Sequence, residues 1–197
     1  MKYLFFDIEC ADGGKATICS FGYVIADMDF NILDHDDIIM NPEGRFYLTG
    51  RAGRPDVNLA YPIDRFKKAP NFAHFHKRIK ELVENEDYYI VVHSIGDDVT
   101  YLNKACKRYG LEPFKFEYFD TQRMYRELSK EKRQISLENA LVALDVDEKF
   151  RSHQSVEDAR ATMLLLKALL NKAEMSFEVY KNSTNRCSGR TDGGNSQ

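Results

Sequence analysis

The stretch KYLFFDIEC, residues 2 to 10, decides the fold class of this chain. Its first half is almost continuously apolar and rich in aromatic residues, which is typical of a strand buried on both faces of a sheet. Asp7 and Glu9 interrupt it, and because side chains alternate along a strand, the two carboxylates project from the same face. The stretch therefore predicts a central strand that carries an acidic pair. The alternative is that the strand ends at residue 6 and both carboxylates face water.

The acidic pair has a chemical consequence if it lies inside the fold. Two carboxylates without partners are costly to bury, so they require cations. Mg²⁺ and Mn²⁺ suit ligand sets made only of oxygen atoms. Asp7 and Glu9 are therefore candidate metal ligands.

The sequence outside this strand alternates between strand and helix patterns. Residues 41–69 hold clusters of glycine, proline and arginine, which predicts an irregular excursion. The other expected elements are strands at 17–27, 30–40, 88–92 and 116–120, and helices at 71–83, 97–109, 121–130, 136–144 and 155–170. The first three strands form a meander, and the whole pattern describes an α/β domain with a mixed sheet flanked by helices.

Composition limits the possible class of protein. The 197 residues, 43% of them hydrophobic, suit one globular domain, expected over residues 1–181. Residues 182–197 lack apolar periodicity and are expected to form a disordered tail. The net charge of -3 argues against a strongly basic nucleic-acid binder but allows local basic patches.

The cysteines and the N-terminus indicate the compartment. Four cysteines are widely scattered without a CxxC pair, so free thiols in a reducing cytoplasm are expected. The short apolar run at the N-terminus is interrupted by Asp7 and Glu9, so neither a signal peptide nor a membrane span is expected. These features predict a cytoplasmic protein that makes no contact with a membrane.

Two further acidic groups stand at expected helix starts. In RSHQSVEDARATMLLLKALL, residues 151–170, Ser155 and Asp158 fit a capping box, which by itself explains both residues without any chemistry. Asp97 and Asp98 begin the helix after the strand at 88–92, where one acid can serve as a cap or a partner of the helix dipole. Because adjacent residues point about 100° apart on a helix, the cap accounts for only one of the pair.

Taken in order, the three motifs resemble those of the DEDD superfamily of 3'-5' exonucleases, which have a ribonuclease H-like fold. FFDIEC supplies Asp7 and Glu9, HSIGDDVTYL supplies an acid, and HQSVED supplies His153 and Asp158. The histidine spacing is similar to the DEDDh branch, which includes the proofreading subunit of bacterial DNA polymerase III, ribonuclease T and oligoribonuclease. The family's second motif often reads H-N-x-x-F-D, which makes Asp98 the expected ligand and Asp97 the fallback.

This resemblance implies a mechanism and a set of residues. Asp7, Glu9, Asp98 and Asp158 would hold two Mg²⁺ or Mn²⁺ ions, and His153 would act as general base without binding them. The substrate would be the 3' end of single-stranded DNA or RNA, with a polymerase or another replication or repair protein as a possible partner. Cys10, Ala11 and Tyr101 are expected to adjoin the terminal nucleotide, and the aromatic rings of Phe6, Tyr101 and Phe119 are candidates for base stacking.

Some alternatives remain open at this point. The loop at 43–68 does not align with the family. The arginines and lysines between residues 45 and 80 fit either a phosphate track or an ordinary solvated surface. A non-catalytic nucleic-acid or polymerase-binding module, an endonuclease, and a nucleotide phosphohydrolase are the rival functions.

Overall fold

The structure of the protein is a computed structural model that describes residues 1–12, 15, 17–46, 60–147 and 153–191. Its strands form one six-stranded sheet in the order β3-β2-β1-β4-β5-β6. The strands are β1 (Lys2–Cys10), β2 (Ile18–Ala26), β3 (Ile32–Ile39), β4 (Tyr88–Val92), β5 (Glu117–Asp120) and β6 (Ser188–Arg190). β1 pairs antiparallel with β2 and parallel with β4, so the predicted mixed sheet with an opening meander is confirmed.

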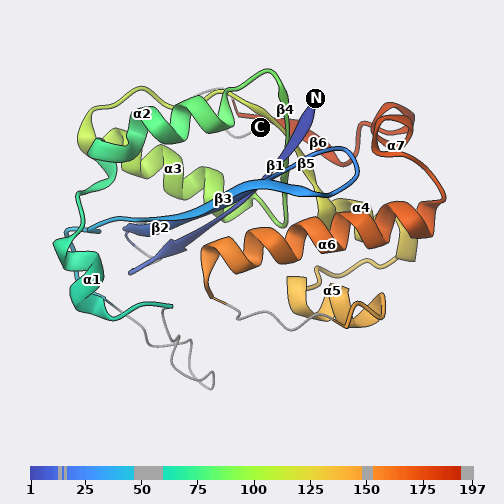
Figure 1. Ribbon diagram of the computed structural model, residues 1–197, viewed down its shortest axis with the longest axis horizontal. Coiled ribbons are helices and arrows are strands. Elements are labelled where there is room, and N and C mark those ends of the chain that lie inside the picture. The colour runs from blue at the N-terminus through green and yellow to red at the C-terminus, as the bar shows by residue number, and fades with distance from the viewer. Residues whose placement is uncertain (13–14, 16, 47–59, 148–152, 192–197) are drawn as a thin grey trace.

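Helices cover both faces of this sheet (Figure 1). They are α1 (Ile63–Lys68), α2 (Phe72–Val83), α3 (Gly96–Tyr109), α4 (Thr121–Ser129), α5 (Leu137–Ala143), α6 (Ser155–Ala173) and α7 (Phe177–Ser183). In Figure 1, α2 and α3 lie on one side of the strands, while α5 and α6 lie on the other. The predicted α/β architecture is therefore confirmed.

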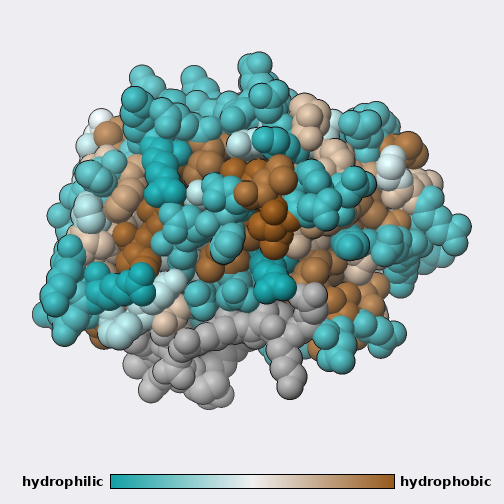
Figure 2. Space-filling view, in the orientation of Figure 1, coloured by the Kyte–Doolittle hydropathy of each residue, from teal (hydrophilic) through white to brown (hydrophobic). Residues whose placement is uncertain are grey.

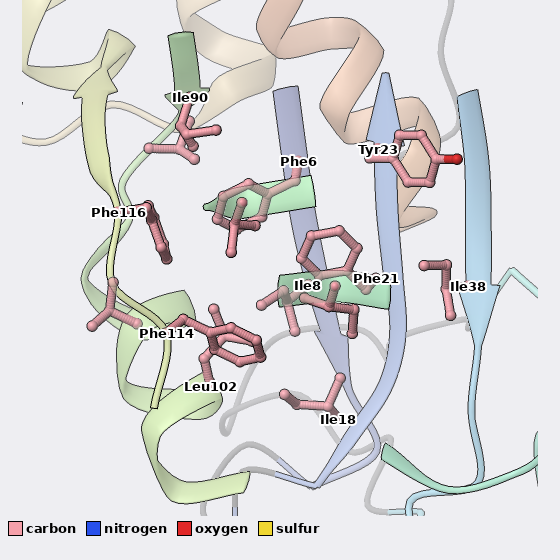
Figure 3. Close-up of a cluster of buried hydrophobic side chains, with 14 of the residues drawn as sticks. Phe6, Ile8, Ile18, Phe21, Tyr23, Ile38, Ile90, Leu102, Phe114 and Phe116 are labelled. Carbon is pink, nitrogen blue, oxygen red and sulfur yellow. The ribbon is translucent and has the colours of Figure 1, made fainter. Parts of the chain in front are cut away.

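β1 is buried on both faces and continues to Cys10, so the alternative in which it ends at residue 6 is wrong. Leu4, Phe6 and Ile8 point into the cluster that α2 and α3 cover, part of which is drawn in Figure 3. Tyr3 and Phe5 point to the opposite face, into the cluster built around α6. Because side chains alternate, Asp7 and Glu9 continue the row that faces α6.

The 41–69 segment was expected to be irregular, and this expectation is wrong in its last part, where α1 forms. Phe66 is the one buried residue of this six-residue helix, and it packs with Ala11 and Cys19 next to the end of β1. A helix with a single buried residue has no apolar period, so the sequence pattern could not reveal it. Residues 47–59 of the predicted loop lie outside the described residues.

The prediction of a disordered tail from residue 182 is also wrong where the structure describes it. Ser188–Arg190 pair antiparallel with β5, and Cys187 is fully buried. The Thr191 hydroxyl accepts a hydrogen bond from the Phe116 N–H at 3.0 Å and donates to the Phe114 carbonyl at 3.0 Å. A three-residue strand held mainly by backbone bonds carries no hydrophobic signal, and residues 192–197 lie outside the described range.

The surface seen from the β3 edge is largely hydrophilic (Figure 2). A hydrophobic patch lies between the helix layers, and Ile32 and Leu33 at the start of β3 are among the exposed large apolar side chains. Asp34 and His35 follow them on this exposed edge strand, where charged side chains oppose pairing with another chain. Among the described residues, no helix is both long and apolar enough to cross a lipid bilayer.

Candidate active site

Three predicted carboxylates meet at the end of β1. Asp7 and Glu9 point from β1 toward the first turn of α6, which carries Asp158. One carboxylate oxygen from each residue lies within 4.8 Å of the other two. Residues far apart in the sequence therefore form one group of oxygen ligands, of the kind that a hard divalent cation prefers.

Asp98 adds a fourth carboxylate from the first turn of α3. Its residue is 8% exposed, whereas the neighbouring Asp97 is exposed to solvent. The charge of Asp98 is among those that raise the pKa of Asp7, but Asp98 is not one of the three residues whose oxygens lie within 4.8 Å of one another. Its burial and its effect on Asp7 favour Asp98, rather than the exposed Asp97, as the predicted fourth ligand.

Asp120, the last residue of β5, is also a buried acid, but its role is structural. Its carboxylate accepts hydrogen bonds from the N–H groups of Gln122 at 2.9 Å and Ser94 at 3.1 Å, and it lies 3.4 Å from the N–H of Ile95. It therefore caps α4 and holds the turn that leads into α3. In doing so it fixes the position from which Asp98 projects.

Burial and neighbouring negative charges raise the pKa of three of these carboxylates, Asp7, Asp98 and Asp158. Burial and the charges of Asp98, Glu9 and Asp158 raise the pKa of Asp7 well above its ordinary value. Burial, together with the charges of Asp97 and Glu9, also raises the pKa of Asp98. Burial and the charge of Glu9 raise the pKa of Asp158 to about 7. A divalent cation bound between these groups would offset the repulsion, so the donor set fits a metal centre.

These raised pKa values predict how the stability of the metal-free chain depends on pH. The folded chain holds protons on Asp7, Asp98 and Asp158 that the unfolded chain has already lost above about pH 4. The site should therefore destabilise the fold as the pH rises toward about 7. Mn²⁺ should raise the melting temperature, and more so at about pH 8 than at about pH 5, because protons compete with the metal. Thermal unfolding with Mn²⁺ or EDTA measures this; an equal effect at both pH values would contradict it.

His153 lies beside the Glu9 carboxylate, two residues before the start of α6. Its side chain is 57% exposed, and its Nδ1 is 3.7 Å from Oε1 of Glu9. Its backbone N–H donates to the Asp158 carboxylate at 3.0 Å. The contact with Glu9 is the main cause that raises the pKa of His153, and burial opposes it. An accessible imidazole beside the carboxylates is in the place that a general base requires.

The backbone at His153 is unusual. Its φ is 64°, in the left-handed region that residues other than glycine seldom occupy. Such conformations persist where the surrounding structure holds them, and here the hydrogen bond to Asp158 ties the residue to α6. The conformation turns the chain so that the imidazole and Asp158 both face Glu9.

The predicted capping box at Ser155 is wrong. The helix cap is Gln154, whose side chain makes no capping bond, and Ser155 is the first residue of α6. The fully buried Ser155 hydroxyl instead donates to Asp37 at 2.6 Å and lies 2.8 Å from the Ser20 hydroxyl. These bonds attach the start of α6 to β2 and β3, so a residue expected to cap the helix anchors it to the sheet.

Tyr61, in the segment before α1, contacts the start of α6. The Tyr61 hydroxyl accepts a hydrogen bond from the Gln154 amide at 3.3 Å. Burial raises the pKa of Asp37, and hydrogen bonds from Ser155 and Tyr61 partly oppose this. The Arg65 guanidinium lies 4.2 Å from the centre of the Tyr61 ring. Tyr61 belongs to the 43–68 region that does not align with the family, and it contacts Gln154, the residue that follows His153.

Gly22 explains how α6 approaches so closely. It pairs with Asp7 across β1 and β2, and it lies directly beneath the first turn of α6. A Cβ atom at this position would overlap the Val156 nitrogen and the Ser155 carbonyl carbon, and would lie 2.6 Å from the Ser155 oxygen. Only glycine allows the helix backbone to rest on the strand here. The sequence analysis missed Gly22, Asp37 and Ser20, because none of them belongs to a recognisable motif.

The predicted substrate contacts divide into two groups. Tyr101 is partly exposed, and its hydroxyl has its pKa raised to about 12 by burial and by the charges of Asp97, Cys10, Asp98 and Glu9. Cys10 is also partly exposed, so both residues border the acidic group. Ala11 is fully buried and its N–H donates to the Thr17 carbonyl at 2.9 Å, so neither its side chain nor its N–H is open to a nucleotide.

Two of the candidate stacking aromatics are also unavailable. Phe6 and Phe119 are each 1% exposed, and they pack in the two clusters on opposite faces of the sheet. The expectation that they stack on bases is therefore wrong. Their positions next to motif residues reflect the burial of β1 and β5.

The comparisons with known proteins agree with this geometry. The family described as "DNA polymerase III subunit epsilon-like, C-terminal domain", of DEDDh type, matches residues 63–169, more than half of the chain. That range includes the second and third motifs, while Asp7 and Glu9 lie before it. No curated protein matches the chain.

Solved structures share the fold at low sequence identity. The nuclease domain of 3'hExo, a DEDDh family member bound to rAMP, is 16% identical with a TM-score of 0.66, over 89% of this chain and 92% of that one. S. pombe Pop2p in its Mg²⁺ and Mn²⁺ bound form is 14% identical with a TM-score of 0.66, over 86% and 82%. E. coli exonuclease I in complex with a dA16 oligonucleotide is 15% identical with a TM-score of 0.66, over 92% of this chain but 43% of that one. By its family match and its ribonuclease H-like fold, the chain belongs to the DEDDh exonuclease superfamily.

Proposed function

We propose that the protein is a metal-dependent 3'-5' exonuclease that releases nucleoside 5'-monophosphates from single-stranded DNA or RNA. The observation that carries this proposal is the meeting of Asp7, Glu9 and Asp158 within 4.8 Å, with His153 beside Glu9. The family match supports it, as do the structural neighbours bound to rAMP and to a dA16 oligonucleotide.

Two Mg²⁺ or Mn²⁺ ions are the proposed cofactors, and the four carboxylates would hold them. When bound, such a pair activates the attacking water and stabilises the leaving oxygen of a phosphodiester. The four ionised carboxylates balance the charge of the ions, so the loaded site no longer repels a phosphate backbone. The neighbour with Mg²⁺ and Mn²⁺ bound supports this choice of metals.

The protein's own residues have separate tasks in this scheme. His153, with 57% of its side chain exposed, takes the proton from the attacking water. Asp120 and the Ser155–Asp37 bond hold the start of α3 and of α6, and thus the carboxylates that these helices carry. Tyr101 and Cys10 border the place where the terminal nucleotide would lie. A polymerase or repair partner and a cytoplasmic location also remain predictions.

Substitution of His153 tests the role of the imidazole. Asn is the better replacement because it tolerates the left-handed backbone at this position, whereas Ala adds strain. His153→Asn should lower kcat by about 100-fold to 10,000-fold, the usual contribution of a general base, with little change in melting temperature. Single-turnover hydrolysis with Mn²⁺ measures the loss. Unchanged turnover in a folded variant would remove His153 from the mechanism.

The direction and position of cutting distinguish the proposal from its rivals. A single strand labelled at its 5' end should shorten stepwise from the 3' end and release mononucleotides. Internal fragments would indicate an endonuclease, and digestion of free nucleotides alone would indicate a nucleotide phosphohydrolase. Strand binding without any Mn²⁺-dependent turnover would favour the non-catalytic module. Parallel DNA and RNA strands of the same sequence identify the substrate.

A further inference from the structure

We propose that a cavity beside α4 binds a backbone phosphate of the nucleic-acid strand upstream of its 3' end. This inference rests on the proposed function and extends it to a second contact site, which we term the α4 pocket. The α4 pocket has a volume of about 510 Å³. Its lining consists of Arg123, Arg126, Glu127, Lys130, Glu131 and Arg186.

The cations of α2, which lie in the predicted 45–80 track, are engaged by carboxylates. Arg78 pairs with Asp36 at 2.8 Å, Lys80 pairs with Glu112 at 3.1 Å, and Lys77 lies 3.8 Å from Glu81. The positive charge of α2 is thus largely neutralised by neighbouring carboxylates. This part of the surface fits the solvated alternative better than a phosphate track.

The cations of the α4 pocket differ in this respect. Within the described ranges, Arg126, Lys130 and Arg186 have no carboxylate oxygen within 4.0 Å. Of the donors on the Arg126 guanidinium, one Nη donates to the Lys132 carbonyl at 3.1 Å, while Nε is shielded from solvent and has no hydrogen-bond partner. Because Nε is shielded from a ligand as well, an anion in the cavity would be bound by the exposed Lys130 and Arg186 and by the remaining donors of the Arg126 guanidinium.

The two acids of the pocket reduce its positive charge without cancelling it, because four cations line the pocket with two carboxylates. One carboxylate oxygen of Glu127 accepts hydrogen bonds from three neutral groups, the Tyr180 hydroxyl at 3.3 Å, the Thr184 hydroxyl at 3.5 Å and the Cys187 thiol at 3.4 Å. Glu131 is exposed, and it is followed directly by the exposed cations Lys132 and Arg133. The pocket therefore lies in a locally basic surface on a chain whose net charge is -3.

Helix α4 runs from Asp120, near Asp98, to the residues that line the pocket. Asp120, whose charge raises the pKa of Asp98, caps the first turn of this helix. At 1.5 Å per residue, Arg126 and Lys130 lie about 9 Å and 15 Å along α4 from Asp120. The loop after α4 returns toward the start of this helix. Its Ile135 carbonyl accepts a hydrogen bond from the Gln122 side chain at 3.0 Å and lies 3.2 Å from His93. Lys132 and Arg133 lie on this returning loop.

The ligand chemistry follows from the geometry of the donors. Guanidinium groups and an ammonium around an open cavity suit an anionic oxygen group, and phosphate is the anion that a nucleic-acid strand supplies. A single strand whose 3' end lies at the acidic group has its upstream phosphates available at the distance that α4 spans. Contact at the α4 pocket would thus add affinity for longer strands without touching the reacting phosphodiester.

The test uses Lys130→Asn combined with Arg186→Gln. Asn suits the left-handed backbone at Lys130, where φ is 56°, and no described contact involves either side chain apart from the pocket itself. The matched control is Lys107→Gln combined with Lys172→Gln, which removes the same charge from exposed positions on α3 and α6. Binding of a fluorescent single strand of about ten nucleotides and of a dinucleotide is measured by anisotropy with Mn²⁺ in the His153→Asn background, in which hydrolysis is slowed.

The proposal predicts about tenfold weaker binding of the longer strand by the pocket variant, with the dinucleotide unaffected and the control close to wild type. Loss of the contact with one phosphate should reduce the slope of log K against log salt by about 0.7. An equal loss in the control, an equal loss for the dinucleotide, or no loss would overturn it. Orthophosphate that saturates the pocket without competing with the longer strand would also overturn it, since the site would then serve a free ion.

Hydrolysis is measured separately with Mn²⁺. Absence of turnover in the wild type would overturn the proposed function, while a length-dependent binding loss would still support the pocket. Normal turnover with unchanged binding in the pocket variant would overturn the pocket alone.

Discussion

Asp7→Asn should abolish metal-dependent hydrolysis, with a loss on the order of 10,000-fold, while making the metal-free protein more stable at about pH 8. The opposite signs of the two effects have one cause. Asp7 is a half-buried carboxylate whose ionisation is opposed by burial and by Asp98, Glu9 and Asp158. A neutral amide of the same shape removes that repulsion. It also removes a carboxylate ligand that lies next to Glu9 on β1 and Asp158 on α6.

A neighbouring acid provides the control for this variant. Asp97→Asn removes a charge one residue from Asp98, but Asp97 is exposed to solvent. It should keep activity within about threefold of wild type, because surface charges are largely screened. Hydrolysis rates and thermal unfolding in EDTA measure both effects. If Asp7→Asn retained activity, or if Asp97→Asn lost it to the same extent, the assignment of ligands would be wrong.

Gly22→Ala should destabilise the protein by about 3 kcal/mol or more and remove most of its activity. The added methyl group would overlap the backbone of Ser155 and Val156, which cannot rotate away as a side chain can. The start of α6 must then move off β2, which breaks the bonds from Ser155 to Asp37 and Ser20 and carries Asp158 away from Asp7. Urea unfolding and Mn²⁺-dependent hydrolysis report the two losses.

Gly96 offers the matched control on the other face of the sheet. A Cβ atom there would meet nothing within 4 Å, and the residue begins α3, where alanine is a better helix former. Gly96→Ala should leave stability unchanged or raise it by up to about 1 kcal/mol. Tolerance of alanine at both positions would show that α6 does not depend on close contact with β2.

The sequence predicted the parts of the fold that carry a strong periodic pattern. β1, with aromatic residues on both faces, and α6, with a long apolar face, follow directly from the spacing of hydrophobic residues. α1 and β6 are short, and they are stabilised by Phe66 and by backbone pairing with β5, which leave little trace in a sequence pattern. Irregular composition was therefore mistaken for lack of structure in both places.

The candidate site was predicted in its reactive groups but not in its supports. Asp7 and Glu9 stand out because acids interrupt an apolar strand, and His153 and Asp158 stand out by their spacing. Asp37 comes from an edge strand with several other acids, so its bond to Ser155 depends on tertiary packing that no local pattern encodes. Ala11 shows the converse, because its place after a motif suggested contact with substrate, whereas it is buried beneath α1.

Titration of the metal-free protein with Mn²⁺ by calorimetry at about pH 8 tests the central claim most directly, namely that carboxylates from β1, α3 and α6 together hold a pair of divalent ions. The expected result is saturable binding of two ions in the wild type, reduced at least about tenfold in affinity by Asp158→Asn and unaffected by Asp97→Asn. Absence of saturable binding, or equal binding by the wild type and Asp158→Asn, would contradict the metal centre.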